Sequence, residues 1–142
     1  MPDRNRSRSL LPRLLLDTHV LIRWLSDARK LSRTQLRAID STVKRGEPVA
    51  LSAISLMEIA LLTSGEKLTL KVSLEEFFQD LSSNPVFCVL PLSYEVALDI
   101  ASLGAVRDPF DRAIAATARV HRLRLVTSDQ RIIASKLVPV VE

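Results

Sequence analysis

The stretch Leu14-Leu15-Leu16-Asp17-Thr18-His19 decides the predicted fold, because a short apolar run passes through one aspartate directly into a helix. The apolar residues that follow have helical spacing: Val20, Leu21, Trp24 and Leu25. A wholly apolar run followed at once by an amphipathic helix is typical of a strand buried on both faces of a parallel sheet. Asp17 would then lie at the carboxyl end of that strand, where open α/β sheets place their ligands.

Apolar periodicity predicts that strands and helices alternate along the rest of the chain. We expect strands at residues 14–17, 49–51, 86–90, 123–127 and 138–141. We expect helices at residues 18–26, 32–45, 52–65, 73–82, 93–103, 108–121 and 130–135. Apolar spacing predicts that Val43 lies on the buried face of the helix at 32–45 and Leu61 on the buried face of the helix at 52–65. This order predicts an α/β fold, a three-layer α/β/α sandwich around a mostly parallel sheet of four to five strands.

The composition fits one domain with a charged extension. Residues 14–142 are expected to form a single domain, because 142 residues with 47% hydrophobic content are enough for one core. The net charge of +4 lies mainly in residues 1–13, which hold four arginines against one aspartate. We expect this basic stretch to be a disordered, solvated tail, with a nucleic-acid-binding arm as the alternative.

Composition also excludes several classes of protein and site. Aromatic residues make up 4% of the chain, which argues against a base-stacking platform for nucleic acid. The single cysteine, Cys88, excludes an internal disulfide and a cysteine-rich zinc site, and it suits a reducing compartment. No apolar stretch approaches the roughly 20 residues that cross a bilayer. The sequence therefore predicts a cytoplasmic protein with no membrane partner.

Asp17 and Glu58 each admit a structural and a functional explanation. Asp17 could cap the helix that follows it, or it could face a site at the sheet edge. Glu58 lies on the predicted apolar face of the helix at 52–65, where it could complete a capping box with Ser55. A carboxylate on an apolar face is costly unless it is paired or binds a cation. This cost favours a functional role for Glu58.

Three further aspartates lie where helices are predicted to begin. Asp108 is expected to be the N-cap of the helix at 108–121, with Pro109 at its first position and Asp111 at its third. Asp111 should then project from the first turn over the strand ends. Asp129 follows the strand at 123–127 and is either a helix cap or a site residue.

The four acidic positions together indicate a shared site more strongly than any one of them does alone. Asp17, Glu58, Asp111 and Asp129 each follow a strand or lie early in the next helix, and these positions share one edge of a parallel sheet. Carboxylates in one cleft repel one another, and a hard cation such as Mg²⁺ or Mn²⁺, which prefers oxygen ligands, removes that repulsion. Such a site suits phosphodiester hydrolysis by metal-activated water.

Four segments carry a resemblance to a known family: residues 15–21, 52–59, 108–118 and 125–129. In this order and spacing they resemble the PIN-domain nucleases and, within them, the VapC-like toxins of bacterial toxin–antitoxin pairs. The resemblance extends from residue 14 to about residue 141. It implies an α/β/α sandwich, an endoribonuclease dependent on Mg²⁺ or Mn²⁺, a homodimer, and a VapB-like antitoxin whose tail covers or enters the active cleft.

Site residues are carried over position by position. The family's acidic quartet is matched by Asp17, Glu58, Asp111 and Asp129. Hydroxyl groups near that quartet are matched by Thr18, Ser52 and Thr127. Asp108 also matches a common family residue, at the start of a helix rather than as a ligand.

The resemblance also suggests roles for the quartet. Asp17 and Asp111 are expected to be the main metal ligands. Glu58 would bind the metal directly or hold the attacking water, and Asp129 would act through a water or a second metal. Arg112 would contact phosphate or pair with a quartet carboxylate, with an ordinary exposed or paired helix arginine as the alternative.

Two other functions compete with the nuclease. A receiver-like domain phosphorylated on aspartate also uses Mg²⁺ and acids at strand ends, but Thr127-Ser128-Asp129 stands where such a domain needs a lysine. A binding module would hold RNA or a partner protein without turnover. The near-neutral charge of residues 14–142 argues against tight unspecific binding of RNA. The RNA target itself is not encoded in any motif.

Overall fold

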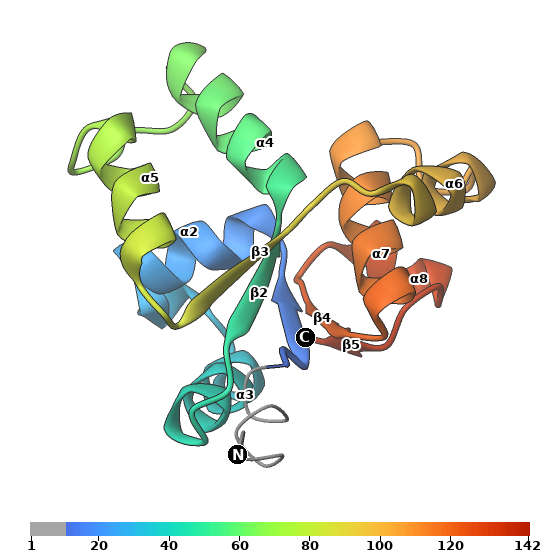
Figure 1. Ribbon diagram of the computed structural model, residues 1–142, viewed down its shortest axis with the longest axis horizontal. Coiled ribbons are helices and arrows are strands. Elements are labelled where there is room, and N and C mark those ends of the chain that lie inside the picture. The colour runs from blue at the N-terminus through green and yellow to red at the C-terminus, as the bar shows by residue number, and fades with distance from the viewer. Residues whose placement is uncertain (1–10) are drawn as a thin grey trace, which may run out of the picture.

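The computed structural model describes residues 11–142, and at its centre is a five-stranded sheet in which every pairing is parallel (Figure 1). The strands are β1 (Leu14–Leu16), β2 (Val49–Ser52), β3 (Phe87–Leu90), β4 (Arg124–Val126) and β5 (Val140–Val141). Their order across the sheet is β3-β2-β1-β4-β5, so the first strand of the chain lies in the middle. The predicted parallel α/β sheet is confirmed, with five strands.

Helices follow the strands as the sequence predicted. They are α2 (Thr18–Ser26), η1 (Ala28–Lys30), α3 (Arg33–Lys44), α4 (Ala53–Ser64), α5 (Leu74–Ser83), α6 (Tyr94–Ser102), α7 (Pro109–His121) and α8 (Gln130–Ser135). Ser32, Ser73 and Ser93 begin three of them by accepting a hydrogen bond from a backbone N–H of the first turn. The 3₁₀ helix η1 was not predicted, because three residues are too few to show periodicity.

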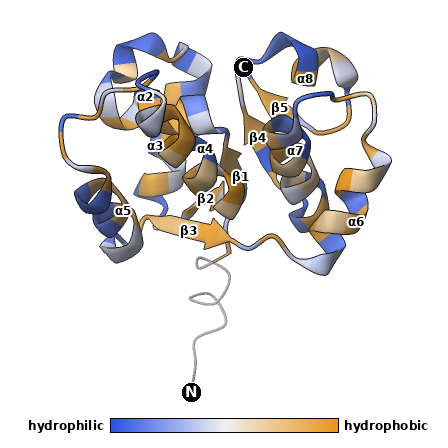
Figure 2. Cartoon of the chain, turned by 90° about the horizontal axis from the view of Figure 1, so that it is seen from above, coloured by the Kyte–Doolittle hydropathy of each residue, from blue (hydrophilic) through white to orange (hydrophobic). Residues whose placement is uncertain are grey.

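Two apolar cores on opposite faces of the sheet create the three layers (Figure 2). Leu14 and Leu16 belong to the core beneath α2, α3 and α5. Leu15 belongs to the other core, beneath α6, α7 and α8. Successive side chains of a strand point to opposite faces, so a run of three leucines supplies both cores from the central strand. This explains why β1 is apolar at every position.

The buried faces of two helices differ from the prediction. Val43 was expected to be buried in α3 but is 36% exposed, whereas Gln35 and Thr42 are buried. Leu61 was expected on the buried face of α4 but is 50% exposed. Gln35 can be buried because its amide is satisfied on both sides: it completes a capping box with Ser32 and donates to the Ser128 hydroxyl. Apolar spacing alone could not show this.

The predicted basic tail at 1–13 lies mostly outside the described residues. Within the described part, Arg13 forms an ion pair with Glu47, with 3.7 Å between Nε and Oε1. Among residues 11–142, none of the helices has the length and apolar content needed to cross a membrane.

Candidate active site

Four carboxylates from separate segments line one cleft at the carboxyl edge of the sheet. Asp17 follows the central strand β1, Asp129 lies just beyond the neighbouring strand β4, Glu58 belongs to α4 and Asp111 to the first turn of α7. The cleft has a volume of about 160 Å³, and we call it the acidic cleft. The structure therefore brings together all four acidic residues that the sequence singled out.

Asp17 is the most firmly held of the four. It is 6% exposed and is the N-cap of α2, where its Oδ1 accepts a hydrogen bond from the Val20 N–H at 2.7 Å. Its Oδ2 accepts a hydrogen bond from the buried hydroxyl of Thr127. The sequence left open whether Asp17 caps a helix or faces a site, and the structure shows that its side chain caps α2 and also lines the cleft.

The electrostatic environment of Asp17 is mixed. Burial raises the pKa of Asp17 above its ordinary value. The hydrogen bonds from Thr127 and Val20 and the positive charges of His19 and Arg23 act in the opposite direction. An ionised Asp17 is thus costly to bury and depends on these neighbours.

Thr127 connects two members of the quartet. Its Oγ1 donates to Asp17 and accepts a hydrogen bond from the backbone N–H of Asp129 at 3.0 Å. Asp129 is the N-cap of α8, where its Oδ1 accepts from the N–H groups of Arg131 and Ile132. The predicted closeness of Thr127 to the quartet is thus a direct contact.

The other two predicted hydroxyls have structural partners. Thr18 lines the cleft and donates from Oγ1 to the Ser55 hydroxyl at 2.9 Å, which joins α2 to α4. Ser52 is the N-cap of α4 and accepts from the Ile54 N–H, and it does not line the acidic cleft. Because Ser52 is the cap, the capping box considered for Ser55 and Glu58 is not formed.

Asp108 and Asp111 divide their tasks at the start of α7. Asp108 is exposed and caps the helix by accepting hydrogen bonds from the N–H groups of Phe110 and Asp111. Asp111 lines the cleft, and its pKa is raised to about 7, first by burial and then by the negative charges of Asp108, Asp129, Glu58 and Asp17. Asp111 is therefore where repulsion within the cluster is concentrated.

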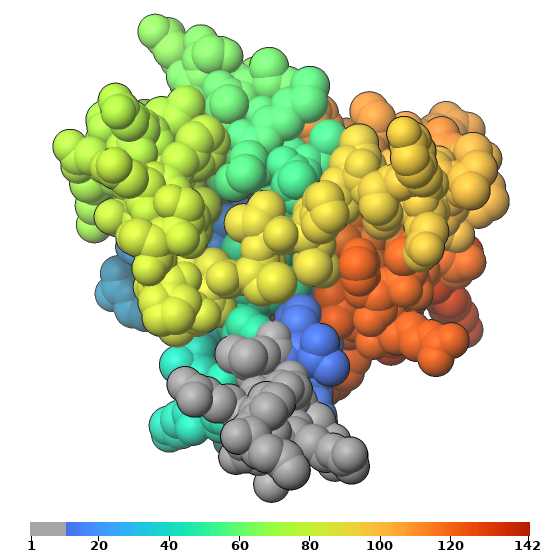
Figure 3. Space-filling model, viewed as in Figure 1, coloured from blue at the N-terminus to red at the C-terminus, as the bar shows by residue number. Residues whose placement is uncertain are grey.

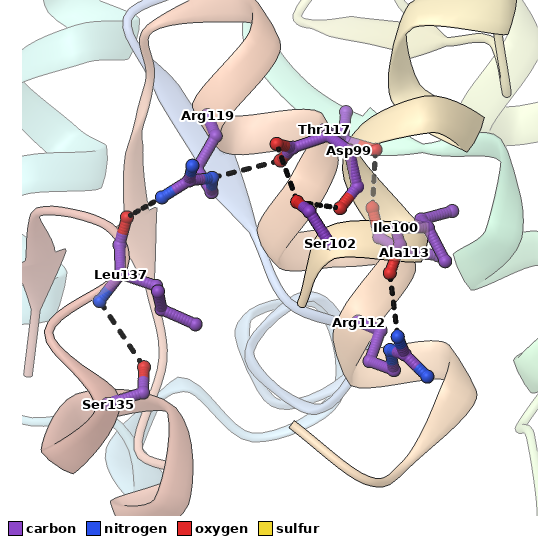
Figure 4. Close-up of polar contacts among 9 residues, drawn as sticks. All are labelled: Asp99, Ile100, Ser102, Arg112, Ala113, Thr117, Arg119, Ser135 and Leu137. Atoms are coloured by element: carbon purple, nitrogen blue, oxygen red, sulfur yellow. Dashed lines mark hydrogen bonds and ion pairs between the residues drawn. The ribbon is translucent and has the colours of Figure 1, made fainter. Parts of the chain in front are cut away.

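Arg112 does not lie in the cleft. Its Nη2 donates to the carbonyl oxygen of Ile100 in α6 at 2.8 Å, and no ion pair within residues 11–142 includes it (Figure 4). Successive helix residues are turned by about 100°, so if Asp111 faces the cleft its neighbour faces α6. The suggested pairing of Arg112 with a quartet carboxylate is not seen.

The contacts of Arg112 belong to a set that fastens α7 to its neighbours. Arg119 pairs with Asp99 of α6 at 2.9 Å and donates to the Leu137 carbonyl at 2.9 Å (Figure 4). These bonds hold α6 and the segment before β5 against α7. The helix that supplies Asp111 is thereby fixed from two sides.

Sequence reasoning missed three polar residues that line the cleft. His19 and Arg23 line it from α2, and Ser128 lines it from the segment after β4. Ser128 is held by Gln35 of α3, whose Nε2 donates to the Ser128 hydroxyl at 3.0 Å. For His19 and Arg23 a signal was available, since they are four residues apart and share the helix face that begins beside Asp17.

The arrangement offers oxygen donors to a cation. Among the residues that the structure describes, however, no three Asp, Glu, His or Cys side chains already converge closely enough to hold a metal ion. Both carboxylate oxygens of Asp17 are engaged, while Glu58 and Asp111 form no ion pair within residues 11–142. No quartet carboxylate forms an ion pair in that range, but Asp17 and Asp129 accept hydrogen bonds, so Glu58 and Asp111 are the two quartet members whose carboxylates have no hydrogen-bond partner among the described residues.

Comparison with known proteins adds a family to this geometry. Ribonuclease VapC22 of Mycobacterium tuberculosis is 32% identical over 121 residues, which is 84% of this chain and 88% of that protein. The structure of FitAcB from Neisseria gonorrhoeae is 29% identical, with a TM-score of 0.62 over 91% of this chain and 96% of that one.

A more distant solved structure shares the fold. It is VapBC-5 from Mycobacterium tuberculosis, described as a member of the VapBC family of toxin–antitoxin systems. It is 20% identical, with a TM-score of 0.57 over 92% of this chain and 99% of that one. The model of the PIN domain family matches residues 14–136, from the central strand to the end of the last helix. The chain belongs to the PIN domain family.

Proposed function

We propose that this chain is a metal-dependent endoribonuclease and the toxin of a toxin–antitoxin pair. The observation that carries the proposal is that carboxylates of four separate segments line one cleft: Asp17, Glu58, Asp111 and Asp129. The relative VapC22 is named a ribonuclease and matches most of the chain, which supports RNA as the substrate.

The donor chemistry of the cleft fits Mg²⁺ or Mn²⁺. All four acidic side chains offer oxygen, the donor that these ions prefer. Burial first, and then the negative charges of Asp108, Asp129, Glu58 and Asp17, raise the pKa of Asp111, and a cation bound in the cleft would oppose both effects. When bound, the metal would lower the pKa of a coordinated water and balance charge on the phosphate.

The residues of the cleft would divide the work. Asp17, fixed by Thr127 and the first turn of α2, and Asp111, at the start of α7, would be the main metal ligands. Glu58 would bind the metal directly or orient the attacking water. Asp129, held as the cap of α8, would act through a water or at a second metal.

Cleavage of structured cellular RNA by the purified full chain tests this proposal. The protein is freed of any co-purifying partner and incubated with Mg²⁺, with Mn²⁺ or with EDTA. Asp17→Asn and Asp111→Asn are tested in parallel, and Asp40→Asn, an exposed change on α3, is the matched control. We expect discrete fragments with metal from the wild-type chain and the control, and none from the two site variants.

Two results would overturn the assignment. Cleavage that continues in EDTA would remove the metal from the reaction. Binding of RNA without any cleavage, by a folded sample with either metal, would identify the chain as a binding module instead.

The antitoxin is proposed to occupy an apolar groove between α2 and α5. This groove has a volume of about 360 Å³, and Ile22, Leu25, Phe77 and Leu81 contribute to it. Leu25 is 45% exposed there and Val72 is 42% exposed, so apolar side chains of a partner protein would bury apolar surface in this groove. Co-expression with a candidate antitoxin should yield a complex that co-purifies and does not cleave RNA, and Leu25→Asp should weaken that complex. We also propose that the protein acts in the cytoplasm, because its RNA substrate is present there.

A homodimer is proposed to form through α4 and α6. Large apolar side chains of these helices face solvent: Met57 is 54% exposed, Leu61 50%, Tyr94 93% and Leu98 74%. In Figure 3, the segment that leads from β3 to α6 lies at the surface between α5 and α6, and no other part of the described chain covers it in that view. Leu98→Asp should shift sedimentation toward a monomer, whereas Val43→Asp on α3 should leave the dimer intact.

A further inference from the structure

The acidic cleft has one basic wall. His19 and Arg23 lie about one helical turn apart on α2, and both line the cleft. Of the described residues that line it, these two are the basic ones. The wall therefore belongs to the same helix whose first turn holds Asp17.

Arg23 has no fixed anionic partner within residues 11–142. The ion pairs of that range involve Arg13, Arg29, Arg45 and Arg119, and among the arginines left without one Arg23 is the one that lines the acidic cleft. Arg23 lies in the last turn of α2, where a cation is favoured by the helix dipole. The dipole accounts for a basic residue in that turn, but it does not require the side chain to line an acidic cleft.

RNA that enters this cleft brings a phosphate charge to each nucleotide and meets four carboxylates. Coulomb repulsion opposes its entry unless cations lie along its path. A guanidinium suits this task, because its planar fork of N–H donors matches two phosphate oxygens. Arg23 also lies about one helical turn beyond His19, and so away from Asp17 along the cleft wall.

We propose that Arg23, with His19 beside it, binds the RNA backbone at the phosphate next to the scissile one and so positions the strand over Asp17. This inference rests on the proposed ribonuclease function. It makes Arg23 a substrate-binding residue and leaves metal binding to the carboxylates. The contact reads the backbone and not the base, so it acts on any sequence.

Binding without turnover is the direct test. A short fluorescein-labelled single-stranded RNA is titrated with the full chain carrying Asp111→Asn, and fluorescence anisotropy is followed over a series of salt concentrations. Arg23→Gln, Arg23→Lys and, as the matched control, Arg37→Gln are each added to that background. Arg37 is exposed on α3 and does not line the cleft. Thermal unfolding of each variant verifies its folding.

We expect Arg23→Gln to raise the Kd about tenfold and to lower the salt slope by about 0.7, the value for one phosphate contact on a single strand. Arg23→Lys should recover part of the affinity, because it restores the charge without the fork. In the otherwise wild-type chain, Arg23→Gln should raise KM more than it lowers kcat.

The outcomes separate this inference from the function on which it rests. If Arg23→Gln and Arg37→Gln bind RNA equally well and the wild-type chain cleaves RNA, the role of Arg23 alone is overturned. If RNA binding depends on Arg23 but the wild-type chain does not cleave RNA, the contact of Arg23 is supported and the proposed nuclease function is overturned. A chain that neither binds nor cleaves RNA would overturn both.

Discussion

Replacing Asp111 with asparagine should stabilise the fold while it abolishes cleavage. Burial and four neighbouring carboxylates raise the pKa of Asp111 from 3.8 to about 7. A rise of about 3 in the pKa means that ionising Asp111 destabilises the folded chain by about 4 kcal/mol. Asp111 is only half-buried, so solvent screening reduces this to about 2 kcal/mol. The substitution also loses a favourable helix-dipole interaction of about 0.3–1 kcal/mol.

The net gain is therefore about 1–2 kcal/mol, which is about 3–6 °C in Tm for a chain of this size. Because the pKa of Asp111 is higher in the folded than in the unfolded chain, its ionisation costs stability as the pH rises from 3.8 to about 7. The advantage of Asp111→Asn should thus be absent below pH 3.8 and complete above about pH 7.

Urea unfolding in EDTA, followed by circular dichroism across this pH range, measures the difference. Asp40→Asn on α3 is the control, since it removes a carboxylate that does not line the cleft. A variant no more stable than the wild-type chain above pH 7, or equally stabilised at every pH, would refute the reasoning from repulsion.

Three further variants test contacts of the cleft. Asp17→Asn removes a proposed metal ligand, so RNA cleavage should vanish. The change keeps an acceptor for the Val20 N–H and removes a buried charge but loses the acceptor of the Thr127 hydroxyl, so the Tm should change by only a few degrees. Thr127→Val removes the bonds to Asp17 and to the Asp129 N–H and should cost about 1–3 kcal/mol in urea unfolding, whereas Thr127→Ser should restore both stability and cleavage. Gln35→Leu removes the bond to the Ser128 hydroxyl and the capping-box bond from the Ser32 N–H, with a loss of about 1–2 kcal/mol; it should speed amide hydrogen exchange after β4, and unchanged exchange there would contradict the anchoring of Ser128.

The fold was largely predictable because its signals are local. The three leucines before Asp17, the serines at helix starts and the Asp108-Pro109 pair each specify their element through nearby backbone. The acidic quartet was predictable for a related reason: parallel strands bring the residues that follow them to a common edge. Errors arose where burial was inferred from apolar spacing, as for Val43 and Leu61.

The sequence by itself determined the order of elements, the sheet edge at which the acidic residues gather, and the residue types available to a cation. Only the tertiary structure decided which side chains meet. Thr127 reaches Asp17 across 110 residues and Gln35 reaches Ser128 across 93, and neither pairing has a local pattern. The tertiary structure also places the Arg112 side chain against α6 and the Arg23 side chain in the wall of the cleft. Spacing along a helix relates side chains to one another, but the packing of helices on the sheet decides what each face contacts.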